Sequence, residues 1–275
     1  MNEGKTGRSI DAAVVLCRVR EAGNLGSICR AMKTMGLTRL LLADCPDYDE
    51  SLVRTMAVHA ADVFENAQRY STLKEALYNF SLSAGFTRRS GAKRRTVNLS
   101  VRDFAKAATG IPVPDLPFVK REKSLALVFG NERDGLSDQE LALCSLSVHI
   151  PSSDSFPSLN VAQAVQIACY ELFTSGIEAK GMNDDSQMIK YPDQQGEESI
   201  LSRRSIEQKV DGIIGAFAER GAFKQSDDSY LRGFLRDLCE RAGIRQSELE
   251  YLHKTFFKAF ALGLKSEGKR RPQER

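Results

Sequence analysis

Short apolar runs alternate with longer amphipathic stretches over the first part of the chain, up to residue 175. Such runs are typical of strands in a parallel sheet, because helices bury both faces of these strands. The stretches between them place apolar residues three and four positions apart, as helices do. This alternation indicates an α/β sheet covered on both faces. We expect strands at residues 12–17, 39–43, 80–85, 125–129 and 147–150, with intervening helices that include 28–36, 71–79 and 101–109.

The pattern changes after residue 175. Residues 176–200 are polar, contain three glycines and a proline, and show no period, which predicts a flexible linker. Residues 201–264 again carry apolar stripes at helical spacing, interrupted by Gly221 and Gly243. We therefore expect a small all-α domain after the linker, with helices at residues 206–220, 230–242 and 247–264.

The composition is consistent with a two-domain globular protein, but it does not indicate a binding partner. The 275 residues can bury a full core and leave room for a small second domain. Lysine and arginine total 39 against 36 acidic residues, so the net charge of +3 indicates no particular partner. The six cysteines form no C-x-x-C pair and are expected to be buried thiols in a reducing compartment. We expect no signal peptide and, with no apolar run near the ~20 residues of a membrane span, a cytoplasmic protein.

Candidate chemistry lies in three loops, each of which follows a predicted strand. The loops are Gly/Asn-rich at residues 23–27, polar at 130–135, and Pro/Ser-rich at 151–160. Open α/β sheets bind ligands at the carboxyl ends of their strands, so these loops are candidates for one site. The first lacks the G-x-G-x-x-G pattern of dinucleotide sites, and no Gly-Lys-Ser/Thr follows the second, which argues against NAD and ATP. The three histidines are scattered, and we expect no metal site.

Three ordered motifs, GNLGSICRAMKTMGL, LVFGNERDGL and IPSSDSFPSLNVAQAVQIACYEL, give the chain a family resemblance. It resembles the TrmH-type SPOUT RNA 2′-O-ribose methyltransferases, and among them the TrmJ branch that acts on tRNA. The resemblance implies a parallel sheet with a C-terminal trefoil knot, a homodimer, and S-adenosylmethionine (AdoMet) as cofactor. It divides the chain into a SPOUT methyltransferase domain at residues 10–175, a flexible linker at 176–200 and a helical C-terminal domain at 201–264.

The function implied by this resemblance is AdoMet-dependent methylation of a ribose 2′-hydroxyl in tRNA, at cytidine or uridine of anticodon-loop position 32. Two alternatives stay open at this stage. One is methylation of a ribosomal RNA ribose. The other, of a different class, is a non-catalytic RNA-binding paralogue, against which the retained Asn24, Arg30 and Asn160 argue.

By the same resemblance, the cofactor would lie against three loops. Ile150 and Leu159 would sandwich the adenine, and Gly130 would let the backbone approach the adenosine. From the residues alone, Ile150 and Leu159 are equally well explained as core, and Ser158 as the N-cap of the helix that follows. The implied cofactor-binding residues are Phe86, Thr87, Arg88, Gly130, Ile150, Pro157, Ser158 and Leu159.

The resemblance implies that Arg30 is the main catalytic residue. A guanidinium has a pKa above ~12, so it can act as a base only through a rare neutral form. It can also stay charged and stabilise the developing alkoxide, which we favour. Without the motif, Arg30 would be a solvent-facing helix residue, and Glu132 would pair with a basic neighbour. The expected catalytic set is Arg30, Asn24, Glu132, Ser158 and Asn160.

Local clusters of positive charge, rather than the net charge, indicate an RNA partner. The chain has no tryptophan, and its pattern suggests no aromatic platform, so we expect recognition by shape and phosphate. The expected RNA-binding residues are Arg18, Arg20, Arg89, Lys93, Arg94 and Arg95. The helical C-terminal domain either extends this footprint or only supports a dimer; its basic residues include Arg203, Arg204, Lys209, Arg232, Arg236, Lys254 and Lys258.

Overall fold

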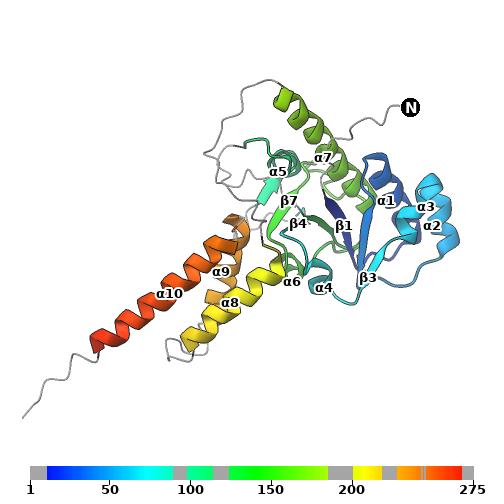
Figure 1. The fold of residues 1–275 in the computed structure, drawn as a ribbon. Coiled ribbons are helices and arrows are strands. Elements are labelled where there is room, and N and C mark those ends of the chain that lie inside the picture. Colours follow the sequence, from blue (N-terminus) through cyan, green and yellow to red (C-terminus); the bar gives the residue numbers. More distant parts are fainter. Residues whose placement is uncertain are drawn as a thin grey trace, which may run out of the picture. The chain divides into compact units, whose positions relative to one another are not determined.

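The chain forms two compact units, Met1–Gln194 and Gln195–Arg275. The structure is a computed structural model, and it describes residues 11–88, 98–113, 124–184, 201–218, 228–242, 244 and 246–267. The first unit has an α/β architecture and the described part of the second is helical (Figure 1).

A seven-stranded sheet forms the centre of the first unit, and every strand pairs in parallel with its neighbours. The strand order is β3-β2-β1-β6-β4-β7-β5, so the strands whose ends carry the expected cofactor loops, β4, β6 and β7, lie close together. The strands are β1 (Ala12–Cys17), β2 (Arg39–Ala43), β3 (Gln68–Tyr70), β4 (Leu82–Phe86), β5 (Asn98–Ser100), β6 (Leu125–Phe129) and β7 (Leu146–His149).

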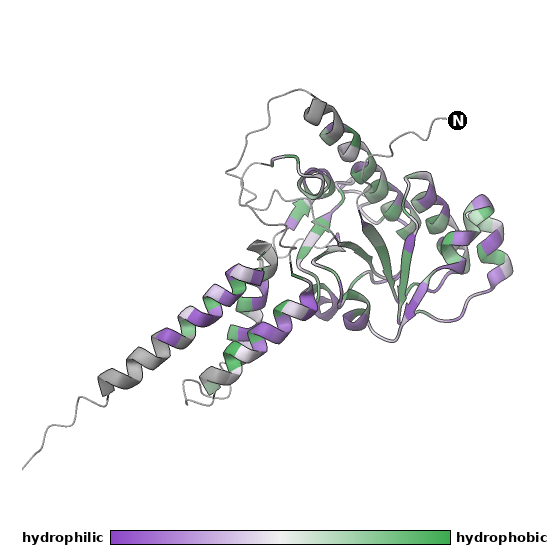
Figure 2. Ribbon diagram, viewed as in Figure 1, coloured by the Kyte–Doolittle hydropathy of each residue, from purple (hydrophilic) through white to green (hydrophobic). Residues whose placement is uncertain are grey.

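Helices cover both faces of the sheet, as the alternating pattern predicts. Val14 and Leu16 of β1 join one hydrophobic cluster, whereas Ala13 and Val15 join a second on the opposite face. The first cluster includes residues of α1 (Ala22–Thr34), α2 (Glu50–Ala57), α5 (Val101–Thr109) and α7 (Val161–Asp184). The second includes residues of α4 (Leu73–Leu77) and α6 (Asp138–Ala142). The 3-10 helix η1 (Val58–Ala60) and α3 (Ala61–Glu65) follow α2. Figure 2 shows the central strands as mostly hydrophobic.

The predicted strands match the central sheet closely and miss its edges. Strands at 12–17, 39–43 and 125–129 have the observed bounds, and those predicted at 80–85 and 147–150 are shifted by one or two residues. The missed strands, β3 and β5, lie at the two edges of the sheet and are three residues long. Their exposed positions are polar, so they lack the continuous apolar run of a buried strand.

Helices α1 and α7 depart most from the prediction. The helices predicted at 71–79, 206–220, 230–242 and 247–264 differ from the observed bounds by three residues or fewer, and the one at 101–109 agrees. Helix α1 begins at Ala22 rather than at residue 28, so the Gly/Asn-rich segment at 23–27 is helical rather than a loop. A Cβ on Gly26 would lie 2.4 Å from the carbonyl oxygen of Val53, so glycine here permits the close packing of α1 on α2. Helix α7 continues to Asp184, into the segment predicted as a linker from residue 176. Helix propagation from a long packed helix outweighs the cost of about 1 kcal/mol for each glycine.

The described part of the second unit contains three helices, α8 (Arg203–Ala218), α9 (Asp228–Ala242) and α10 (Gln246–Glu267). They share a separate hydrophobic core, which supports the unit without residues from the first. The fully or largely buried members are Leu201, Ile206, Val210, Ile213, Ile214, Leu235, Cys239, Ile244 and Leu249.

Candidate active site

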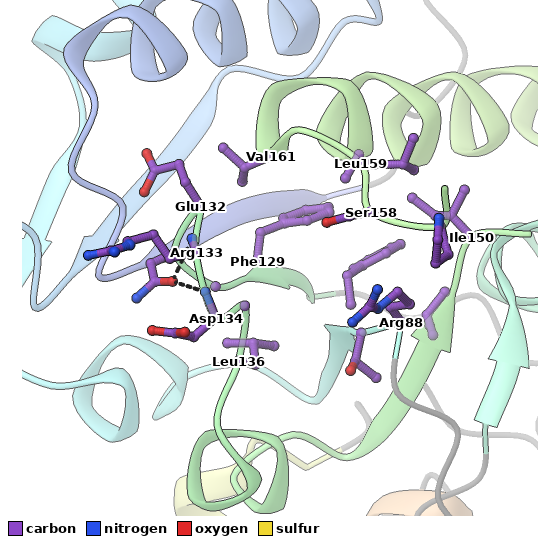
Figure 3. A pocket seen from close by; sticks show the side chains of 18 residues that line it. Arg88, Phe129, Glu132, Arg133, Asp134, Leu136, Ile150, Ser158, Leu159 and Val161 are labelled. Carbon is purple, nitrogen blue, oxygen red and sulfur yellow. Dashed lines mark hydrogen bonds between the residues drawn. The ribbon is translucent and has the colours of Figure 1, made fainter. Parts of the chain in front are cut away.

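A pocket opens where β4, β6 and β7 end and α7 begins. This is the carboxyl edge of the sheet, where α/β proteins bind ligands. Figure 3 shows the segment of Glu132, Arg133 and Asp134 on one side of the pocket and Ile150, Ser158 and Leu159 on the other. The lining residues are Phe86, Thr87, Arg88, Phe129, Gly130, Asn131, Glu132, Arg133, Asp134, Gly135, Leu136, Val148, Ile150, Pro157, Ser158, Leu159, Val161 and Ala164. All eight residues expected to bind the cofactor are among them.

Aromatic and aliphatic side chains make part of this pocket apolar. The rings of Phe86 and Phe129 are stacked with centroids 4.4 Å apart, and Phe104 packs edge-on against Phe86 at 6.1 Å. Offset stacking of this kind is a favoured aromatic arrangement. Because Phe86 and Phe129 end neighbouring strands, their contact joins the two loops that follow β4 and β6 into one wall.

Contacts among its own residues hold part of the loop at residues 130–136. The side-chain oxygen of Asn131 accepts hydrogen bonds from the N–H groups of Arg133 (3.1 Å) and Asp134 (2.7 Å). Asn131 and Gly135 form an antiparallel bridge, and Gly135 has a φ of +68°, which glycine adopts readily. A Cβ on Gly130 would lie 2.1 Å from the carbonyl carbon of Gly135. Gly130 is therefore required by the loop's own backbone, and not only by a close ligand.

A chain of hydrogen bonds joins three of the five expected catalytic residues. The Asn160 side chain donates to the Asn24 side chain (3.0 Å), which donates to Glu132 (3.2 Å). Glu132 also accepts the backbone N–H groups of Arg20 and Glu21 at the start of α1. Burial alone would raise the pKa of Glu132, but these hydrogen bonds outweigh burial and lower it. Glu132 therefore holds the two residues before α1 and the side chain of Asn24, rather than pairing with a basic neighbour.

Asn160, not Ser158, caps α7, which begins at Val161. Its side-chain oxygen accepts the N–H of Ala162 (2.8 Å), and Gln163 accepts the backbone N–H of Asn160 (3.3 Å). This reciprocal pattern is a capping box. Ser158 lies two residues earlier, exposed, in the wall of the pocket.

Arg18 and Glu140 form a partly buried ion pair beside the pocket. Nε and Nη2 of Arg18 donate to the two carboxylate oxygens of Glu140 at 2.6 and 2.8 Å. Burial would raise the pKa of Glu140, but hydrogen bonds from Arg18, the Ser137 backbone and Cys17 outweigh it and lower the pKa to about 2. Arg18 was expected to contact RNA, whereas here its guanidinium is engaged within the protein.

This pair makes a specific contribution to stability that depends on pH. The pKa of Glu140 falls from 4.5 to about 2 on folding, so its stabilising effect is complete above pH 4.5 and is lost as the pH falls towards 2. In urea unfolding, the wild type should exceed a Glu140→Gln variant in free energy of unfolding at neutral pH. This difference should shrink steadily below pH 4.5. A difference that stays constant with pH would contradict the assigned pKa.

A second hollow lies between α1 and the start of α7, and it is more open than the pocket. Asn24, Ser27 and Ala31 line it from α1 and Asn160, Gln163 and Ile167 line it from α7, together with Leu159, Ala162 and Gln166. Leu159 also lines the first pocket, so the two adjoin. Arg30 lies one turn beyond Ser27 on α1, where its side chain is exposed.

The remaining predicted site residues lie at the surface or outside the described part. Arg20 and Arg88 are exposed, and Arg88 lines the pocket. Arg89, Lys93, Arg94 and Arg95 lie outside the described residues. Within the described part, no group of three or more His, Cys, Asp or Glu could hold a metal ion. None of the helices described is both long and apolar enough for a membrane crossing.

Sequence reasoning missed several residues of the site. Phe129 and Val148 line the pocket, although as members of predicted strands they looked like core only, and Leu136, which follows the polar turn, lines it too. Residues 131–135 were recognised as a polar turn after a strand, a signal that could have assigned the whole segment to the site. Phe156 is 78% exposed in the loop that borders the pocket, an exposed aromatic that the sequence pattern did not reveal.

Comparison with known proteins gives a consistent family signal. Residues 11–170 match the SpoU rRNA Methylase family. The tRNA (cytidine/uridine/adenosine-2′-O-)-methyltransferase TrmJ of Pseudomonas aeruginosa is 30% identical over 239 residues, which are 87% of this chain and 90% of that protein.

Two solved structures extend the likeness to the fold. A probable methyltransferase from Bordetella pertussis is 31% identical, with a TM-score of 0.52, over 60% of this chain and 96% of its own. TrmJ from Z. mobilis has a TM-score of 0.65 over 90% of this chain and 98% of its own, at 21% identity. At 21% identity, the similarity to this second structure supports the fold alone.

Proposed function

Because the chain belongs to the SpoU rRNA methylase family, we propose that it transfers a methyl group from AdoMet to a ribose 2′-hydroxyl of tRNA. The observation that carries the proposal is one pocket, built by loops after three neighbouring parallel strands, that adjoins a second hollow through Leu159. A cofactor and a substrate can therefore meet at one place. The P. aeruginosa relative, named as a tRNA 2′-O-methyltransferase, supports tRNA as the substrate.

The pocket fits an adenosine group in its chemistry. Ile150 and Leu159 supply aliphatic surface for the two faces of a base, beside the stacked Phe86 and Phe129. Exposed main-chain groups of the loop at 130–136 can bind the polar edges, as backbone near a glycine does. When bound, AdoMet supplies a methyl group that the positive sulfonium already activates. We propose Phe86, Thr87, Arg88, Gly130, Ile150, Pro157, Ser158 and Leu159 as the residues that hold it.

The protein's own task in this reaction is to orient the ribose, stabilise its developing negative charge and exclude water. We assign the second task to Arg30, which is exposed on α1 beside the second hollow. Asn24 and Asn160 line that hollow and are held by each other and by Glu132, so their orientation is set before substrate arrives. Glu132 thus acts through Asn24, whose side chain it holds. Ser158 lines the first pocket and not the second hollow, so we place it beside the cofactor.

Two measurements on the purified protein test this function. Calorimetry should detect AdoMet binding, and radiolabelled methyl groups should pass from AdoMet to bulk tRNA but not to ribosomes. Transfer to ribosomal RNA alone would favour the ribosomal alternative. RNA binding without any transfer would favour a non-catalytic paralogue.

Several finer features of the family are proposals for this chain. They are the trefoil knot, homodimer formation, a cytoplasmic location and methylation at tRNA position 32. Mapping ribose methylation in a deletion strain tests the position, and sedimentation tests the dimer.

In the described part of the helical C-terminal unit, four of the seven basic residues expected to contact RNA form ion pairs with acidic neighbours. Arg203 pairs with Glu207, Lys209 with Glu250, Arg232 with Asp211 and Asp228, and Arg236 with Asp237. Lys254 and Lys258 are exposed on α10 and, four residues apart, share one side of it. We propose that, among the described residues of this unit, these two lysines make the main phosphate contacts.

Deletion of residues 196–275 should leave AdoMet binding intact, because the pocket and both cores of the first unit lie before the deletion. It should weaken tRNA binding and flatten its dependence on salt, since each lost phosphate contact reduces the slope by about 0.9. Titrations of tRNA at two salt concentrations measure both effects.

A double variant, Lys254→Ala with Lys258→Ala, should reproduce most of the loss without removing the unit. The alternative role of the C-terminal unit is to support a dimer. Sedimentation tests it by measuring whether the truncated protein is still a dimer. A truncated dimer with unchanged affinity and salt slope would show that the tail does not bind RNA.

A further inference from the structure

Arg18 occupies an unusual position at the end of β1. Its φ is +58°, in the left-handed region that non-glycine residues adopt only at a cost. Its backbone N–H donates to the carbonyl of Ala43 (3.0 Å), which holds this turn against β2. Such a conformation persists where the surrounding structure determines it, and the contacts of the Arg18 side chain are part of those surroundings.

The guanidinium of Arg18 joins two parts of the segment that follows β6. It binds both carboxylate oxygens of Glu140, and Nη2 also donates to the carbonyl oxygen of Gly135 at 3.1 Å. The side chains of Arg18 and Glu140 are only 27% and 15% exposed. A bidentate arginine–carboxylate pair of this kind is geometrically specific, and a lysine could not reproduce it.

Glu140 is itself held in place by two further groups. Ser137 and Glu140 form a capping box at the start of α6, in which the Ser137 N–H donates to the Glu140 carboxylate (2.6 Å). The Cys17 thiol donates to the other carboxylate oxygen (3.2 Å). The carboxylate is therefore a rigid anchor for the arginine.

The bond to Gly135 matters because this residue shapes the pocket. Gly135 bridges to Asn131 and leaves no room for a Cβ on Gly130. Holding its carbonyl therefore holds the loop at 130–136, which forms one wall of the pocket.

We propose that Arg18 is a positioning residue for cofactor binding: through Gly135 and Glu140 it keeps the loop at 130–136 in the shape that binds AdoMet, and it does not contact RNA. This role rests on the proposed function of the pocket. It replaces the RNA contact expected for Arg18 with a contact inside the protein.

The test compares Arg18→Met, which keeps the aliphatic stem and removes the donors, with the wild type. Calorimetry should show AdoMet affinity weakened by about tenfold or more. Affinity for tRNA without cofactor, and its salt slope, should stay at the wild-type values. Glu140→Gln should weaken AdoMet binding in the same direction, and the double variant should lose less than the sum of the two.

Two matched controls separate positioning from a general loss of stability. Arg54→Met removes an exposed arginine on α2 that pairs with Glu50 and Glu65, away from the pocket, and should leave AdoMet affinity unchanged. Ser83→Ala breaks the buried Ser83–Ser145 pair between β4 and β7, lowering the melting temperature without loss of AdoMet affinity. If Arg18→Met does not fold, Arg18→Lys, with the charge but not the fork, should show the same selective loss.

Wild-type AdoMet affinity in folded Arg18→Met would overturn the inference, and so would a selective loss of tRNA affinity with a flatter salt slope. The inference would also be overturned if Arg18→Met and Ser83→Ala were equally destabilised and lost AdoMet affinity to the same extent. A wild-type protein that does not bind AdoMet would instead overturn the proposed function, and this inference with it.

Discussion

Replacing Arg30 with alanine should reduce the rate of methyl transfer at least a hundredfold while AdoMet affinity stays near the wild-type value. Loss of a charged contact to the developing alkoxide costs roughly 3 kcal/mol, which corresponds to about a hundredfold in rate. AdoMet affinity should persist because Arg30 is exposed on α1 and is absent from the pocket lining. Single-turnover transfer of radiolabelled methyl to tRNA, with calorimetry for AdoMet, measures the two effects separately.

Lys33 provides the matched control for this variant, because it is a second cation on the same helix that pairs with Asp62 at 2.8 Å, away from the hollow. Lys33→Ala should retain most of the activity. Arg30→Lys distinguishes the two roles of the guanidinium: partial activity would indicate that charge alone contributes, and full loss that the planar fork is needed. Equal loss of rate and AdoMet affinity in Arg30→Ala would place Arg30 in the cofactor pocket instead.

The second large effect is expected at Gly130, where even alanine should abolish AdoMet binding. The added Cβ would lie 2.1–2.3 Å from backbone atoms of Gly135 and Leu136, so the loop must move. Overpacking of this kind costs roughly 1–3 kcal/mol or more, and the displaced backbone forms a wall of the pocket. Calorimetry measures the loss of binding, and circular dichroism reports whether the rest of the fold persists.

Gly212 on α8 is the matched control, since no atom lies within 4 Å of the Cβ that alanine would add there. Gly212→Ala should bind AdoMet as the wild type does. Normal AdoMet binding by a folded Gly130→Ala protein would remove the loop at 130–136 from the cofactor site. The expectation from the sequence rested on a close ligand at Gly130, whereas the structure shows that the loop's own backbone makes the close approach.

Sequence reasoning succeeded where the relevant interactions are repeated along the chain. Strands β1, β2 and β6 were predicted with their observed bounds, because a strand buried on both faces is a continuous apolar run. The cofactor loops were located for a related reason: parallel strands place all their carboxyl ends at one edge, so loops that follow them converge. The three-residue edge strands β3 and β5 lack that apolar signal and were missed.

Tertiary structure alone decided how the site is held together. The start of α1 was misplaced, and the carboxylate that holds the two residues before it belongs to Glu132, more than a hundred residues away in sequence. The same separation hides the link from Asn160 through Asn24 to Glu132, and the pair of Arg18 with Glu140. Sequence periodicity reports which side chains share a face of one element, whereas these contacts depend on where the ends of different elements meet in the folded sheet. The sequence therefore determined the element types, the strand ends and the residue types of the site, and folding determined which of those residues hold one another.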